Sequence, residues 1–73
     1  MISDREFAKN CTELVLEYSA KLDASVAEAQ VRLNAEEFNL YRRAVGAVMA
    51  EGLIQILNPV FRQHPDLKPQ GFD

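Results

Sequence analysis

The chain contains no glycine or proline before Gly46, so the residues that most often interrupt a helix are missing from its first 45 positions. In the same stretch apolar residues recur every three or four positions, which is the period of one helical face. They are Phe7, Cys11, Leu14, Val15, Tyr18, Leu22, Val26, Ala29 and Leu33. This pattern predicts an all-α fold whose first element is a long amphipathic helix.

The first helix has a start signal at Ser3 and Glu6, which have the spacing of a capping box. Ile2 and Phe7 flank it as a hydrophobic staple, so we expect a helix over about residues 4–30. Residues 23–25 are the least certain part of this helix. A second possible capping box starts at Ser25, so a kink or a break there is an alternative.

The second helix has the same two start signals, a capping box and a hydrophobic staple, at its own N-terminus. Asn34 and Glu37 repeat the capping box, and Leu33 and Phe38 repeat the staple. These predict a turn around residues 31–34 and a helix over about 35–57. One uninterrupted helix through both segments is the alternative.

Pro59 should end or kink the second helix, because proline clashes with the preceding helical turn. We expect Phe61 to contact the helices from a proline-containing tail over residues 58–73. Two helices of similar length with a short connection favour an antiparallel hairpin. The chain is therefore predicted to be one helical domain over residues 1–73.

The second helix is apolar on two opposite sides. One stripe suits the first helix and contains Phe38, Tyr41, Val45, Val48, Met49, Gly52 and Ile56. A helix that is apolar all round is usually buried, and one hairpin cannot surround its own helix. We therefore expect two copies to form a homodimer with a four-helix bundle-like core.

The predicted dimer interface is the second apolar stripe, in which small residues lie between large ones. It contains Leu40, Arg43, Ala44, Ala47, Ala50, Glu51, Ile54 and Leu57. If two copies of this helix cross antiparallel at Ala47, Arg43 of each copy meets Glu51 of the other, as a symmetric interface requires. An alternative explanation of the alanines is their high helix propensity.

Composition excludes several classes of site. One cysteine and one histidine permit neither an internal disulfide nor a Cys/His zinc cage, so we expect no metal and no cofactor. A net charge of −3 and a pI near 5.0 argue against a nucleic-acid partner. The N-terminus does not resemble a signal peptide, and the apolar stretch 44–57 is too short for a membrane span. These features favour a cytoplasmic protein without a membrane partner.

Single residues with reactive side chains have structural explanations. Cys11 lies on the apolar face without a nearby base, so we expect it to be buried and inert. His64 is expected at the surface, and Tyr18 and Tyr41 are expected in the core with their hydroxyls at its rim. The acidic pairs at 13 and 17 and at 36 and 37 fit a solvated face and a helix start. No catalytic residue is predicted.

The expected function is that of a small non-enzymatic interaction protein, such as an adaptor, a chaperone-like protein or an accessory subunit, acting as a homo-oligomer. The alternative is a small-molecule-binding or regulatory helical bundle. A polar pocket would favour ligand binding, whereas an exposed apolar groove would favour a protein partner.

Overall fold

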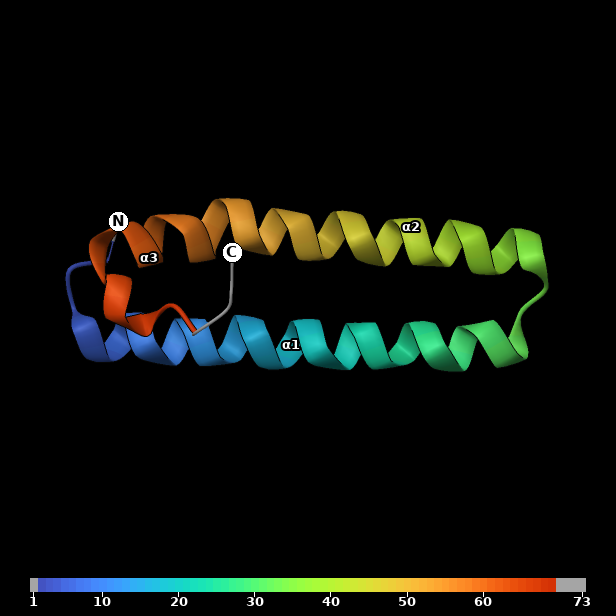
Figure 1. The fold of residues 1–73 in the computed structure, drawn as a ribbon, viewed down its shortest axis with the longest axis horizontal. Coiled ribbons are helices and arrows are strands. Elements are labelled where there is room, and N and C mark those ends of the chain that lie inside the picture. Colours follow the sequence, from blue (N-terminus) through green and yellow to red (C-terminus); the bar gives the residue numbers. More distant parts are fainter. Residues whose placement is uncertain (1, 70–73) are drawn as a thin grey trace.

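The computed structural model describes residues 2–69 and consists of two long antiparallel helices followed by a short helical segment (Figure 1). Helix α1 spans Arg5–Arg32 and helix α2 spans Ala35–Gly52. They pack along their length, and the Cα atoms fill a volume of 45 × 20 × 15 Å. The predicted all-α hairpin is confirmed.

Helix α1 begins one residue later than its predicted capping box. Its N-cap is Asp4, whose Oδ1 accepts a hydrogen bond of 3.1 Å from the Phe7 amide, so the capping role assigned to Ser3 was wrong. A carboxylate is a strong cap because it also interacts with the positive end of the helix dipole. With this register Ala8 is completely buried, whereas Phe7 is 56% exposed.

The turn between the helices is confirmed. The Asn34 side chain accepts a hydrogen bond of 2.9 Å from the Glu37 amide, and Leu33 before it is extended. This excludes one uninterrupted helix. Helix α1 also runs without a break through residues 23–25, and it ends at Arg32, two residues later than expected. Arg32 suits that end because it pairs with Glu28 one turn earlier at 2.8 Å.

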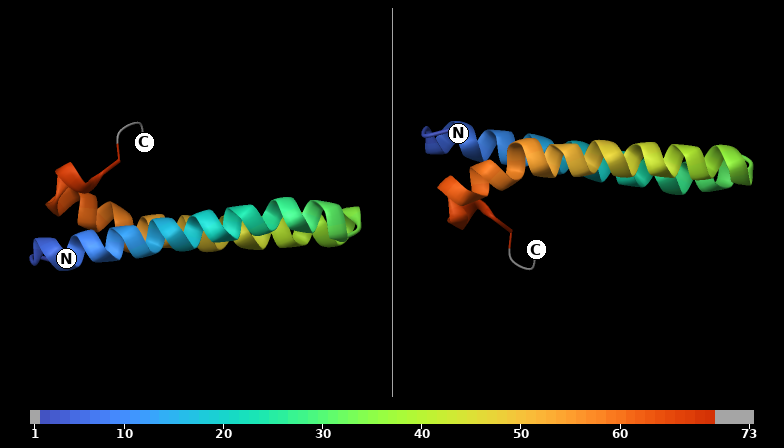
Figure 2. Two further views of the ribbon diagram at one scale, coloured as in Figure 1. Left: turned by 90° about the horizontal axis from the view of Figure 1, so that it is seen from below. Right: turned by 90° about the horizontal axis from the view of Figure 1, so that it is seen from above.

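Pro59 does not end the helical path. A π-helical turn, η1 (Leu53–Leu57), follows α2, and helix α3 (Asn58–Gln63) follows η1 directly. The Asn58 amide donates to the Leu53 carbonyl five residues earlier, so the wider turn makes room where the proline ring would meet the preceding turn. The α-helix thus ends at Gly52 rather than at residue 57. The predicted change of direction is present, since α3 leaves the line of α2 (Figure 2).

The π turn also changes which residues point inward. A row of residues spaced four apart stays buried or half-buried along this path: Val45, Met49, Leu53, Leu57 and Phe61. In a regular α-helix a four-residue step overshoots a full turn by about 40°, so such a row soon leaves the packed face. The wider turn reduces this drift and returns Leu57 and Phe61 to the core.

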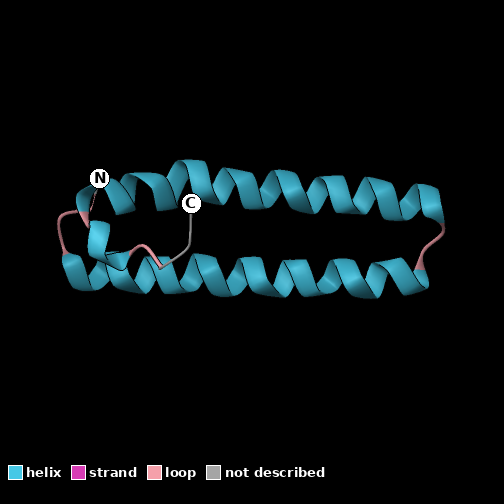
Figure 3. Ribbon diagram, viewed as in Figure 1, coloured by secondary structure: helices cyan, strands magenta, loops and turns pink. Residues whose placement is uncertain are grey.

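The C-terminal segment packs against the start of α1. A short 3-10 helix, η2 (Pro65–Leu67), follows α3, and two contacts join the segment to the N-terminus. Arg5 forms an ion pair with Asp66, and the His64 ring is hydrogen bonded through Nε2 to the Ile2 carbonyl at 2.7 Å. Helices account for almost the whole path from residue 5 to 67, with short loops between them (Figure 3).

The core is concentrated where α1, η1 and α3 meet. Ala8, Leu57, Val60 and Phe61 form its buried cluster, against which half-buried apolar side chains pack: Ile2, Val15, Leu16, Leu53, Ile56 and Leu67. Burial of Phe61 confirms that this part of the predicted tail is docked. Further along the hairpin only Ala29 and Val45 are buried apolar residues within residues 2–69.

Candidate functional site

The outer stripe of α2 is the predicted dimer interface, and seven of its eight residues are exposed: Leu40, Arg43, Ala44, Ala47, Ala50, Glu51 and Ile54. The two large apolar members project well into solvent, since Leu40 is 62% and Ile54 is 54% exposed. Glu51 accepts a long hydrogen bond of 3.4 Å from Gln55, and no ion pair of Glu51 or Arg43 is present within residues 2–69. The prediction that these charges meet across a dimer stays a prediction.

Leu57 was wrongly placed in this stripe. It is only 3% exposed and belongs to the core cluster with Val60 and Phe61. The assignment assumed regular α-helical geometry through residue 57. The π turn over Leu53–Leu57 turns this side chain inward.

A second apolar surface lies along one side of the seam between α1 and α2, and we call it the seam face. Its exposed side chains are Leu14 (67%), Tyr18 (56%) and Val48 (48%). Between them lies a hollow of about 340 Å³ that is also lined by half-buried residues: Val15, Ser19, Gly52 and Ile56. The helices approach closely here, because a Cβ atom on Gly52 would lie 3.4 Å from Val15 Cγ1.

The seam face was not predicted, because its α1 residues were assigned to the core. Phe7, Leu14 and Tyr18 follow one another at steps of seven and four residues, so they share one side of the helix. In the hairpin this side is turned away from the centre of the seam, which is occupied by smaller residues such as Ala8 and Thr12. Helical periodicity places residues on a common face but does not give the direction of that face to within a quarter turn.

The opposite side of the seam is partly covered. Leu16 and Leu53 are half-buried and pack against the core cluster that includes the C-terminal segment. Beyond this cover lies a smaller hollow of about 230 Å³, lined by Leu16, Ser19, Met49, Ala50, Leu53 and Leu57. The two sides of the hairpin therefore differ: α3 and η2 lie on one side of it (Figure 2), and no described residue after Ile56 lines the hollow of the seam face.

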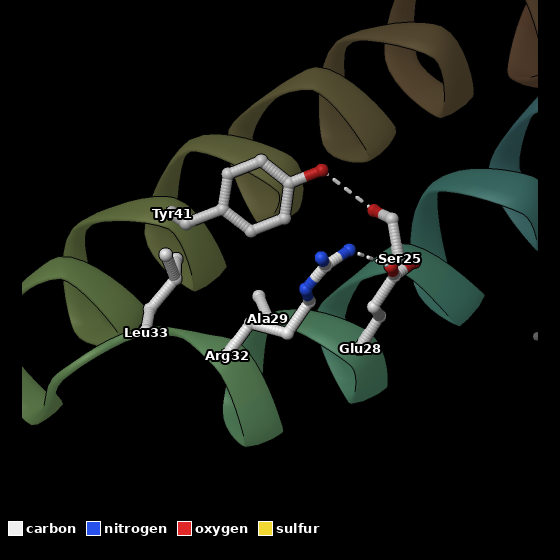
Figure 4. Close-up of a pocket in the computed structure, with 6 residues that line it drawn as sticks. All are labelled: Ser25, Glu28, Ala29, Arg32, Leu33 and Tyr41. Atoms are coloured by element: carbon white, nitrogen blue, oxygen red, sulfur yellow. Dashed lines mark hydrogen bonds and ion pairs between the residues drawn. The ribbon is translucent and has the colours of Figure 1, made fainter.

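A hollow with polar groups lies near the turn, between α1 and α2 (Figure 4). It measures about 350 Å³ and has Ala29 and Leu33 in its wall. Ser25 Oγ lies 2.6 Å from Leu22 O and 2.6 Å from the Tyr41 hydroxyl. Because a serine hydroxyl has one proton, donation to Leu22 leaves Tyr41 as the donor to Ser25. This confirms that Tyr41 lies inside the hairpin with its hydroxyl at the edge.

The polar groups of this hollow interact with one another. Tyr41 donates to Ser25, and Arg32 pairs with Glu28, as the dashed lines in Figure 4 show. A bound small molecule would have to displace at least one of these interactions to gain a polar contact. The hollow therefore gives little support to ligand binding. A further hollow of about 340 Å³ lies beside α3, with Arg62 and Lys68 at its wall.

The single reactive residues fit structural roles, with three corrections. Cys11 is half-buried rather than buried, Tyr18 is exposed rather than in the core, and His64 is half-buried with a backbone partner rather than a plain surface residue. Glu17 pairs with Lys21 at 3.1 Å on α1, and both side chains are exposed. Within the described residues no three His, Cys, Asp or Glu side chains gather as metal ligands.

The ion pair between Arg5 and Asp66 shifts the titration of the carboxyl group. The hydrogen bond from the Arg5 guanidinium lowers the pKa of the Asp66 carboxyl below its ordinary value of 3.8. Both side chains are more than half exposed, so this pair fastens the C-terminal segment at the surface.

The helical path Ala35–Gln63 is long and apolar enough to cross a membrane by length and composition. It has 29 residues, its apolar window has a mean hydropathy of 1.5, and only 22% of that window is buried. The sequence analysis considered only the stretch 44–57, and the longer helical path that contains this stretch corrects the expectation. The helix therefore has far more apolar surface than α1 and α3 cover.

Comparison of the chain with protein-family models, with curated proteins and with solved structures finds no significant match.

Proposed function

We propose that this protein is a small, non-enzymatic helical interaction protein that works as a homodimer, in which two hairpins form a four-helix bundle. The observation that carries the proposal is the exposure of large apolar side chains on both long helices. In the single chain each of the following is at least 38% exposed: Phe7, Leu14, Tyr18, Val31, Leu33, Leu40, Val48 and Ile54.

Three of these residues, Leu14, Tyr18 and Val48, line one hollow, and such a group favours a protein partner. Single exposed apolar side chains are common, but a patch with an apolar hollow at its centre typically marks an interaction site. The polar hollow near Ser25 and Tyr41, which would support ligand binding, has its groups already paired. An adaptor, chaperone-like or accessory role in the cytoplasm is the class of function that such surfaces serve.

A membrane partner fits the hairpin less well than a protein partner. Although Ala35–Gln63 could span a bilayer by composition, α1 packs beside it and carries charges at many turns: Lys9, Glu13, Glu17, Lys21, Asp23 and Glu28. A hairpin crossing a bilayer would bury these charges, and each charged side chain at the centre of a helix costs about 2.5–3.5 kcal/mol.

Sedimentation equilibrium of the purified chain at micromolar concentration tests the proposal. A homodimer gives a mass near twice 8.2 kDa, with dissociation on dilution. A folded, cooperative monomer at these concentrations would contradict it. A flotation assay with phospholipid vesicles is the matching control, because transfer of the chain to the vesicle layer would show a lipid partner instead.

A further inference from the structure

The seam face is the surface that remains open after the chain has folded on itself. The C-terminal segment packs on one side of the hairpin, where Leu16, Leu53 and Leu57 contribute to the core around Phe61. On the other side the hollow around Gly52 has no cover from the described part of the chain.

We infer that the occupant of the seam face is the seam face of a second copy, so that this surface, rather than the outer stripe of α2, forms the dimer. The inference rests on the proposed function and names the surface through which it works. Leu14, Tyr18 and Val48 of each copy then lie in the interior of a four-helix bundle.

The shape of a bundle favours this surface. In a four-helix bundle every helix contacts two neighbours, so both helices of each hairpin must turn apolar residues toward a common axis. The seam face does this, because Leu14 and Tyr18 come from α1, Val48 comes from α2, and Ile56 comes from η1, which continues α2. The outer stripe belongs to α2 and η1 alone, and pairing through it would leave α1 of both copies outside the contact.

The seam face and the outer stripe differ in the area that they can offer to a partner. A face that includes both long helices is about 20 Å wide, so over the roughly 27 Å length of α2 it offers roughly 540 Å². A standard stable interface takes about 800 Å² from each partner. The outer stripe is one helix wide, about 10 Å, and α2 with its 18 residues is about 27 Å long, which gives roughly 270 Å². The two-helix face therefore offers about twice the area of the outer stripe and comes closer to the area that a stable interface takes.

The seam face also has the features that pairing with itself requires. An isologous interface presents the same surface twice, so each copy must supply both projecting and receiving parts. Leu14 and Tyr18 project from the surface. The hollow of about 340 Å³, which is lined in part by Ser19 and Gly52, can receive the projecting side chains of the other copy. The charges next to Tyr18 cancel within each copy, because Glu17 pairs with Lys21, so two copies meet there without like-charge repulsion.

Two matched leucines provide the test by substitution. Leu14 is 67% and Leu40 is 62% exposed in the hairpin, so both tolerate a charge equally well unless a partner covers them. We expect Leu14→Glu to weaken the dimer at least about 30-fold, as for a hot-spot residue, and Leu40→Glu to change dissociation by less than about threefold. Sedimentation equilibrium measures both, and circular dichroism checks that the helices persist.

Hydroxyl-radical footprinting of the unchanged protein provides a second test that no folding defect can mimic. In an isolated hairpin Leu14 and Leu40 should oxidise at similar rates, corrected for residue type and exposure. In the inferred dimer Leu14 and Tyr18 are protected at least about fivefold relative to Leu40 and Ile54.

The possible results separate the inference from the proposed function. Protection of Leu40 and Ile54, or a dimer lost in Leu40→Glu and kept in Leu14→Glu, overturns the seam-face inference and leaves the homodimer standing. A wild-type chain that stays monomeric at about 100 µM overturns both. A dimer weakened by Leu14→Glu alone, with protected Tyr18, supports both.

Discussion

The two ends of the hairpin are built from the same kind of helix but reach different degrees of burial. At the open end, where the N-terminus meets α3, the apolar residues Ala8, Leu57, Val60 and Phe61 are all less than 9% exposed. Toward the turn, two helices pack without a third segment, and only Ala29 and Val45 are buried there.

This difference shows what a pair of helices can and cannot bury. Two cylinders in contact cover only the narrow line between them, so large side chains such as Phe38 and Tyr41 stay half-buried there. A third segment makes a three-sided interior, and side chains as large as Phe61 disappear into it. On this reasoning the remaining open face of the hairpin needs another layer of helices, which is the role that we propose for a second copy.

The largest effect should come from removing the aromatic ring at the open end. We expect Phe61→Ala to lower the free energy of unfolding by about 3 kcal/mol, because it leaves a cavity in the buried cluster. Phe38→Ala near the turn should cost about 1 kcal/mol, since that ring is only half-buried. Urea denaturation at one fixed protein concentration compares the two variants.

The comparison between the ends would fail on a simple result. A loss below about 0.5 kcal/mol for Phe61→Ala would show that the C-terminal segment is not docked in solution. Equal losses for both variants would show that the turn end is packed as tightly as the open end.

The next effect concerns the polar link that joins the helices near the turn. Tyr41 donates to Ser25, which itself donates to Leu22, and both bonds measure 2.6 Å. We expect Tyr41→Phe to cost about 1 kcal/mol. Combined with Ser25→Ala, it should show a coupling of about 0.5–1 kcal/mol in a double-mutant cycle measured by thermal or urea unfolding. Strictly additive losses would mean that the two hydroxyls do not interact.

The glycines of α2 test how closely the helices pack toward the open end. A Cβ on Gly46 would meet nothing within 4 Å, so Gly46→Ala should stabilise the protein by about 0.5–1 kcal/mol through helix propensity alone. On Gly52 the new methyl would meet Val15 Cγ1 at 3.4 Å, so we expect a smaller gain. A larger gain at Gly52 than at Gly46, measured by thermal unfolding, would mean that the helices lie further apart at Gly52.

Local chemistry made the hairpin predictable, whereas its packing direction was not. The turn was found because an Asn34 cap depends only on residues within four positions of it. Leu14 and Tyr18 were misplaced because a periodic pattern leaves the rotation of the helix about its axis undetermined. In this chain, docking of the C-terminal segment against Ala8 and Leu16 accompanies that rotation.

The π turn was hidden for a different reason. Pro59 indicated a disturbance, and the expected remedies were an end or a kink. A widened turn keeps the helix going, and it moves Leu57 from the predicted interface into the core. The sequence contains no separate marker for that choice, because the gain comes from tertiary contacts of Val60 and Phe61.

The smallest expected effect is the pH dependence of the Arg5–Asp66 ion pair at the open end. The Arg5 hydrogen bond lowers the pKa of Asp66 below 3.8, so the folded protein holds this carboxylate ionised to lower pH than the unfolded chain does. The contribution to stability is complete above about pH 5 and is lost as the pH falls through 3.8 toward the lowered value. Both partners are more than half exposed, so the effect on the free energy of unfolding is small and decreases with salt.

Carbon-13 NMR of the aspartate carboxyls measures the pKa of Asp66 directly. The Asp66 carboxyl should titrate below 3.8, and Arg5→Gln should raise that midpoint. A midpoint for Asp66 that ignores this substitution would show that the segment is not fastened to α1 through Arg5, and that the open end depends on its apolar contacts alone.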